Sequence, residues 1–76
     1  MRPKLYGRAY CHLCGEMAAA LRSLGVEFDE IDVDADPGLE ARFGERVPVL
    51  TDARGEELCH YRLDEAIARK LVAGLK

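Results

Sequence analysis

Two cysteines separated by two residues, Cys11 and Cys14, stand where a short strand gives way to a helix. The strand is predicted over Lys4–Arg8. The helix is predicted over Cys11–Leu24, because apolar residues recur there at helical spacing and Gly25 follows as a stop signal. A strand that leads directly into a helix predicts the first half of a parallel crossover unit, so the fold class is α/β.

Single Gly and Pro residues divide the rest of the chain into further short elements. They predict a strand, a helix that starts at Asp36-Pro37 and ends before Gly44, two strands joined by a turn, and a last helix capped by Asp64. The strands are predicted over 26–33, 47–51 and 56–61, the turn over 52–55, and the inward face of the last helix at Ile67, Leu71 and Leu75. The order β-α-β-α-β-β-α predicts one domain over 1–76, with a four-stranded mixed sheet flanked by three helices.

Composition limits the classes of function. The chain has 76 residues, 49% of them hydrophobic and 33% charged, as in ordinary globular proteins. Its net charge of −3 is spread along the chain without a basic stripe, which argues against nucleic acid as a partner. No segment has the apolar length of a signal peptide or a membrane span, so a cytoplasmic monomer is expected.

Three cysteines form an odd number in such a chain, which favours catalytic or metal chemistry over a framework of structural disulfides. At a helix N-terminus the unpaired amides and the helix dipole stabilise an anion, so Cys11 is the candidate nucleophile. Cys14 lies one helical turn further in and is the candidate resolving thiol. The expected activity is thiol–disulfide exchange through a mixed disulfide on Cys11, with no bound cofactor.

Neighbouring residues carry two interpretations each. Arg8 either places a cation near the thiolate or holds an anionic substrate group, or it is simply a solvated arginine. Tyr10 is either a substrate contact or a partly buried aromatic residue. His12 either influences Cys11 or is simply solvated. A cis bond between Val47 and Pro48 would present the Val47 backbone to a substrate peptide, although a trans bond is the general expectation.

Tyr6, the segment Arg8 to Cys14, the Val47-Pro48 pair and the order of elements resemble the glutaredoxin family, particularly its short bacterial glutaredoxin-like members. The resemblance covers nearly the whole chain. It implies a thioredoxin fold, a dithiol site, a cis Pro48 facing that site, and glutathione as the candidate reductant. Arg8 matches the family's basic residue three places before the first cysteine. The substrates it implies are disulfide-containing proteins or small molecules.

Two positions depart from the family pattern. His12-Leu13 replaces the usual pair between the cysteines, and Cys59-His60 stands where a Gly-Gly pair lets glutathione approach the backbone. Cys59 is therefore either a third thiol near the site or a small hydrophobic residue of the core. Asp64 either binds the amino group of glutathione or caps the last helix.

Two other classes of function remain open. In the first, Cys11, Cys14 and Cys59 bind zinc together with His12 or His60, since three thiolates and an imidazole satisfy a tetrahedral site. In the second, the domain keeps the thioredoxin fold and binds a partner without turning over disulfides.

Overall fold

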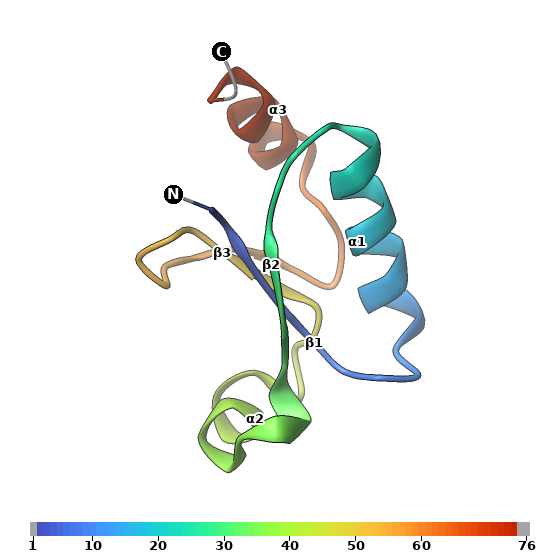
Figure 1. Ribbon diagram of the computed structural model, residues 1–76, viewed down its shortest axis with the longest axis vertical. Helices are drawn as coiled ribbons and strands as arrows, with labels where there is room; N and C mark the ends of the chain where they lie inside the picture. The colour runs from blue at the N-terminus through green and yellow to red at the C-terminus, as the bar shows by residue number, and fades with distance from the viewer. Residues whose placement is uncertain (1, 75–76) are drawn as a thin grey trace.

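The computed structural model describes residues 2–74, which form a small sheet with helices on both faces (Figure 1). The elements follow the order β1 (Lys4–Gly7), α1 (His12–Ser23), β2 (Asp29–Asp32), the 3-10 helix η1 (Val33–Ala35), α2 (Pro37–Phe43), β3 (Val49–Thr51), β4 (Glu57–His60) and α3 (Glu65–Ala73). The predicted order is confirmed, with η1 as an addition. Leu75 lies outside the described residues. Within 2–74, no helix has the length and apolar character needed to cross a membrane.

The four strands lie in the order β2-β1-β3-β4. β1 runs parallel to β2, and α1 forms the crossover between them. β1 and β3 are antiparallel, as are β3 and β4. The sheet is therefore mixed and four-stranded, as predicted, with β2 and β4 at its edges.

Side chains alternate between the two faces of the sheet and build two core clusters. Leu5 and Leu50 are buried on the face covered by α1, and α3 packs against the same cluster through the half-buried Ile67 and Leu71. The adjacent residues of the same strands, including Tyr6, point to the other face, which α2 covers. The sheet thus lies between α1 with α3 on one side and α2 on the other.

All four predicted strands are shorter than expected, and the first ends at Gly7 and not at Arg8. The predicted strand over 26–33 is reduced to β2, because the Val26 amide donates to the Leu21 carbonyl at the end of α1 and Val33 already belongs to η1. The strand predicted from 47 begins at Val49, after Pro48, which lacks an N–H. The strand predicted over 56–61 is β4, one residue shorter at each end.

Candidate active site

Cys11 and Cys14 form a disulfide at the start of α1, with their Cα atoms 5.2 Å apart. Cys11 is the N-cap and not the first helical residue, as its extended backbone shows. Its Sγ accepts a hydrogen bond from the Cys14 amide at 3.1 Å, and the first turn of α1 contains no acidic residue. The free amides and the positive end of the helix dipole are therefore directed at the Cys11 sulfur, where they favour an anion.

The two sulfurs differ in exposure. Cys11 is half-buried, whereas Cys14 is only 8% exposed. Gly7 at the end of β1 lies directly behind Cys14, and a Cβ on Gly7 would be 3.1 Å from the Cys14 Sγ. A reactant that approaches from solvent therefore reaches the Cys11 sulfur before the Cys14 sulfur.

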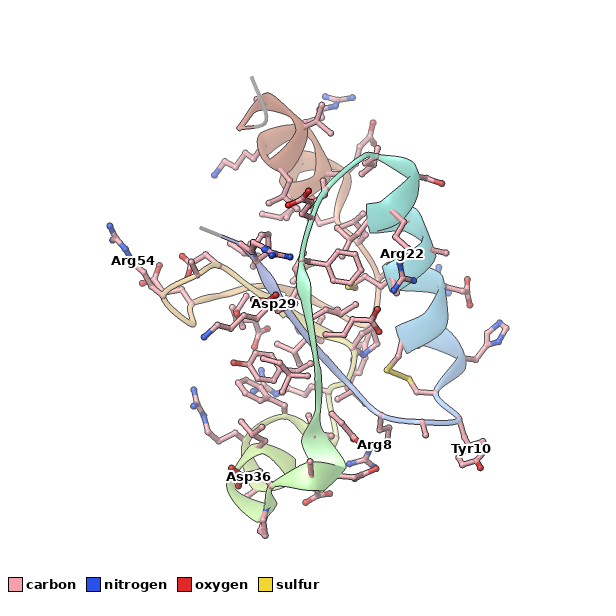
Figure 2. All side chains as sticks on the ribbon, viewed as in Figure 1. Arg8, Tyr10, Arg22, Asp29, Asp36 and Arg54 are labelled. Atoms are coloured by element: carbon pink, nitrogen blue, oxygen red, sulfur yellow. A yellow bond between two sulfur atoms is a disulfide. The ribbon has the colours of Figure 1, made fainter. Side chains whose placement is uncertain are left out.

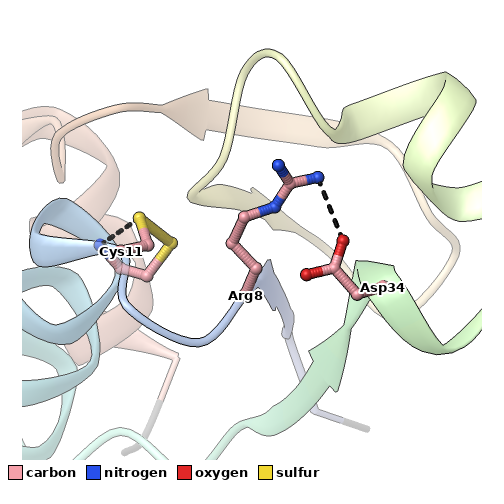
Figure 3. Close-up of a disulfide and its surroundings, with 4 residues drawn as sticks. Arg8, Cys11 and Asp34 are labelled. Atoms are coloured by element: carbon pink, nitrogen blue, oxygen red, sulfur yellow. Dashed lines mark hydrogen bonds and ion pairs between the residues drawn. A yellow bond between two sulfur atoms is a disulfide. The ribbon is translucent and has the colours of Figure 1, made fainter.

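Arg8 lies between the disulfide and the carboxylate of Asp34 (Figure 3). Its Nη2 is 3.3 Å from both Asp34 Oδ1 and Glu40 Oε1. Its Nε is buried, and no hydrogen-bond acceptor for it is found among the described residues. The predicted cation is thus present, but most of its charge is compensated. Sequence reasoning missed both acids, which η1 and α2 contribute and which no pattern marks.

A cavity of about 440 Å³ adjoins the disulfide between α1 and the strands β1 and β2. Both cysteines and Arg8 line it. A ligand in this cavity would touch the redox-capable sulfurs directly.

Tyr10 and His12 point away from the molecule. Tyr10 is fully exposed with a left-handed backbone (φ 62°), so the expectation of a partly buried aromatic residue is wrong (Figure 2). The His12 side chain is 89% exposed, and its Nε2 lies 2.9 Å from a Glu16 carboxylate oxygen. This position fits the interpretation of His12 as a solvated side chain.

The Val47–Pro48 peptide bond is cis, as the family resemblance implied. Because Tyr6 pairs with Val49 in antiparallel register, the next pair along the two strands is Gly7 with Pro48. Pro48 therefore lies beside the glycine that contacts Cys14. Tyr61, which sequence reasoning missed, has a left-handed backbone (φ 65°) and donates its amide to the Pro48 carbonyl at 2.9 Å.

Cys59 is in β4 opposite Leu50, half-buried and packed against the core on the α1 face. Burial raises the pKa of its thiol, and the carboxylates of Asp64 and Glu57 add to that rise. It does not line the cavity at the disulfide. This packing matches the interpretation of Cys59 as a small hydrophobic residue.

The zinc ligand set is not brought together. Within residues 2–74, no three His, Cys, Asp or Glu side chains cluster in a way that could hold a metal ion.

Asp64 caps α3. Its Oδ1 accepts hydrogen bonds from the Ala66 amide at 2.7 Å and the Ile67 amide at 3.4 Å. The capping interpretation is confirmed, and a contact of Asp64 with substrate stays a prediction.

Comparisons with known proteins identify the family of the chain. The sequence profile of the family described as a glutaredoxin-like domain (DUF836) matches residues 4–73. The uncharacterized protein Rv0508 of Mycobacterium tuberculosis is 35% identical over 79 residues, which cover 92% of this chain and 80% of that protein. The uncharacterized protein Mb0520 of Mycobacterium bovis matches to the same extent.

Two solved structures are similar over nearly their whole length. Protein Ne2328 from Nitrosomonas europaea has a TM-score of 0.79 and 41% identity, covering 92% of this chain and 89% of its own. Protein XcR50 from X. campestris has a TM-score of 0.74 and 39% identity, covering 96% and 93%. The thioredoxin-like fold is thereby confirmed, and the Cys11–Cys14 pair within such a domain supports a role in thiol redox chemistry. The chain belongs to the glutaredoxin-like family.

Proposed function

We propose that this protein is a thiol–disulfide oxidoreductase in which Cys11 is the nucleophile and Cys14 the resolving thiol. The observation that carries the proposal is the Cys14 amide 3.1 Å from the Cys11 Sγ at the start of a twelve-residue helix. A hydrogen bond from a backbone amide is stronger to a thiolate than to a thiol, so this contact favours the reactive form of Cys11.

In the proposed cycle the reduced protein starts with a Cys11 thiolate. The thiolate attacks one sulfur of a substrate disulfide, a bond forms between Cys11 and that sulfur, and the other substrate sulfur leaves as a thiolate that takes up a proton. Cys14 then loses its proton and attacks the Cys11 sulfur. The Cys11–Cys14 disulfide forms, and the second substrate sulfur is released as a thiol. The substrate gains two electrons, which an external thiol reductant must return to the protein.

Further contacts are proposed around this centre. Tyr10 offers an exposed ring next to Cys11, and Val47 and Pro48 lie at the end of β3 beside Gly7. We propose that these residues contact the substrate. Glutathione is the proposed external reductant on the strength of the family resemblance, with Arg8 and Asp64 as its candidate contacts. Cys59 remains a candidate third thiol only if glutathione is the reductant.

The first test measures the alkylation rate of each cysteine in the reduced protein as a function of pH. Cys11 is expected to titrate below the ordinary value of a free cysteine, about 8.5, because the helix amides stabilise its thiolate. Cys59 provides an internal reference, since burial raises its pKa. A Cys11 thiol that titrates like a free cysteine would count against the proposal.

A second test measures turnover of a small neutral disulfide. Cys14→Ser is expected to stop after forming a mixed disulfide on Cys11. Cys11→Ser lacks the nucleophile and is expected not to turn over the disulfide. If the unmodified protein fails to reduce the disulfide, that result would count against the oxidoreductase and favour a binding domain that retains the fold without the activity.

A further inference from the structure

The cavity beside the disulfide continues along α1 away from the cysteines. Arg22 lines its far end, and it lies eight residues after Cys14 on the same helix, or about 12 Å at 1.5 Å per residue. On the helix side the wall is made of small residues, Gly15 and Ala18, and Leu5 of β1 also lines the cavity. The cavity is thus a groove, called here the α1–β2 groove, with the disulfide at one end.

The outer wall of this groove is an edge strand. The Asp29 amide donates to the Pro3 carbonyl, so the backbone of Asp29 faces β1. Because successive residues of a strand alternate, the backbone groups of Glu30 and Asp32 point away from the sheet. Such an edge can pair with an additional extended segment, and the side chains of the same two residues line the groove.

Arg8 lines the groove, and its positive charge is paired with two carboxylates of this chain. Its guanidinium is 3.3 Å from both Asp34 and Glu40. Figure 3 shows Asp34 on the side of Arg8 away from the disulfide. An anionic substrate group would have to compete with two carboxylates already in place. Arg8 therefore adds little net positive charge to the groove.

The other charges of the groove leave it acidic. Arg22 forms an ion pair with Glu30 across the far end. Asp32 forms no ion pair among the described residues, and its Oδ1 accepts only the Asp34 amide, at 2.9 Å. The carboxylate of Asp32 is thus the uncompensated charge of the groove, and a cation is its electrostatic complement.

We propose that the α1–β2 groove binds a lysine- or arginine-bearing extended segment of a polypeptide substrate, next to the substrate's disulfide. The segment pairs with the edge of β2, alternate side chains enter the groove, and a basic side chain reaches Asp32. The inference rests on the proposed function and adds the substrate class. The exchange reaction at Cys11 is the one described above.

The test compares two peptides that differ only in whether lysines or glutamates flank one cysteine. In each peptide that cysteine is joined by a disulfide to the same small neutral thiol. The second-order rate constant for oxidation of the reduced protein is measured with each peptide and with a small neutral disulfide. At low salt the rate constant of the lysine peptide is expected to be at least about three times that of the glutamate peptide, because one exposed charge pair contributes enough free energy for a ratio of this size. The preference disappears near 1 M salt, where the Debye length is about 3 Å.

Two variants locate the preference in the groove. Asp32→Asn removes the charge but keeps an acceptor for the Asp34 amide, and it is expected to bring the ratio of the two peptide rates close to one. Glu27→Gln is the matched control, since Glu27 is exposed and outside the groove, and its ratio is expected to stay that of the unmodified protein.

Gly15→Leu tests the groove by its shape. A Cβ on Gly15 meets nothing within 4 Å, so a side chain can start there without a clash at Cβ, and leucine favours the helix more than glycine does. For each variant, the rate constant of each peptide is divided by that of the small disulfide. This ratio is expected to fall severalfold in Gly15→Leu and much less in Gly15→Ala.

The outcomes separate this inference from the proposed function. Equal rates for the two peptides, or a faster glutamate peptide, would overturn the basic-segment inference while reduction of the small disulfide still supports the oxidoreductase. Failure to reduce any of the three disulfides would overturn both.

Discussion

The guanidinium of Arg8 contacts two carboxylates, and this pairing governs how much positive charge acts on the Cys11 sulfur. Glu40→Gln removes one negative charge and keeps an oxygen that can accept from Arg8. We expect the pKa of the Cys11 thiol in the reduced protein to fall. The fall should be less than about one unit, since exposed pairs contribute ~0.2–1 kcal/mol and one unit equals ~1.4 kcal/mol.

The measurement is the pH profile of Cys11 alkylation in a Cys59→Ala background. Glu27→Gln makes the same change of charge away from the site and should leave the profile in place. A Cys11 thiol that titrates higher in Glu40→Gln would mean that Arg8 does not act on it.

Single-residue features show where sequence reasoning reaches its limit. The place of Cys11 at a helix start and the shielding of Cys14 follow from a local pattern and could be predicted, although the helix begins at His12 and Cys11 is its cap. The partners of Arg8 could not, because Glu40 is 32 residues away in sequence and meets Arg8 only through the packing of α2. The left-handed backbones of Tyr10 and Tyr61 were also unpredictable, since tyrosine gives no local signal for that conformation.

At the scale of elements, α3 depends on its cap. Asp64→Ala leaves the amides of Ala66 and Ile67 without their acceptor, and the free energy of unfolding should fall by about 1 kcal/mol. Asp64→Asn should retain most of the stability, because asparagine caps helices equally well. Denaturant unfolding of the three proteins checks this. If Asp64 also binds an amino group of glutathione, Asp64→Asn will weaken glutathione-dependent turnover without this loss of stability.

The edge strand β4 carries a carboxylate whose ionisation is linked to folding. Burial raises the pKa of Glu57, but hydrogen bonds and charges from His60 and Arg46 outweigh burial, and the net pKa lies below its ordinary value. A lowered folded pKa contributes stability above the unfolded pKa, and this contribution is lost as the pH falls through the folded pKa.

We therefore expect the stability difference between the unmodified protein and Glu57→Gln to be largest near pH 6 and to shrink below about pH 4, under the unfolded glutamate pKa of ~4.3. Unfolding curves across this range measure it. A difference that stays constant with pH would show that Glu57 acts by shape and not by charge.

The order of elements could be predicted because Gly, Pro and capping residues punctuate a short chain and the apolar periods between them are clear. Their ends were less predictable. The strand expected over 26–33 has acids between its apolar residues, so pattern alone could not show that Val26 closes the end of α1 and that Val33 begins η1. Tertiary hydrogen bonds decide such ends.

On the scale of the whole molecule, the two core clusters contain neither cysteine of the disulfide, although Cys14 is buried beside them. Leu21, Leu50, Val33 and Val49 are fully buried in the two clusters on either face of the sheet, and Cys11 belongs to neither. Reduction of the disulfide therefore leaves both clusters intact, and the reduced chain should stay folded. The cost of reduction is then confined to the short loop that the disulfide closes.

The difference in stability between the oxidised and the reduced protein can be predicted from the size of this loop. The disulfide joins residues three apart in sequence, and closing so short a loop stabilises the folded chain by ~2 kcal/mol in the chain-entropy description. The Cys14 amide favours a Cys11 thiolate in the reduced form and offsets part of this difference. Denaturant unfolding of the oxidised and the reduced protein should therefore differ by less than ~2 kcal/mol. Since ~1.4 kcal/mol corresponds to ~30 mV, the folded dithiol should have a reduction potential within about 45 mV of the unfolded one. A larger loss on reduction would contradict this prediction: the folded protein would favour its disulfide more strongly, and its dithiol would be a stronger donor of electrons than the loop term alone allows.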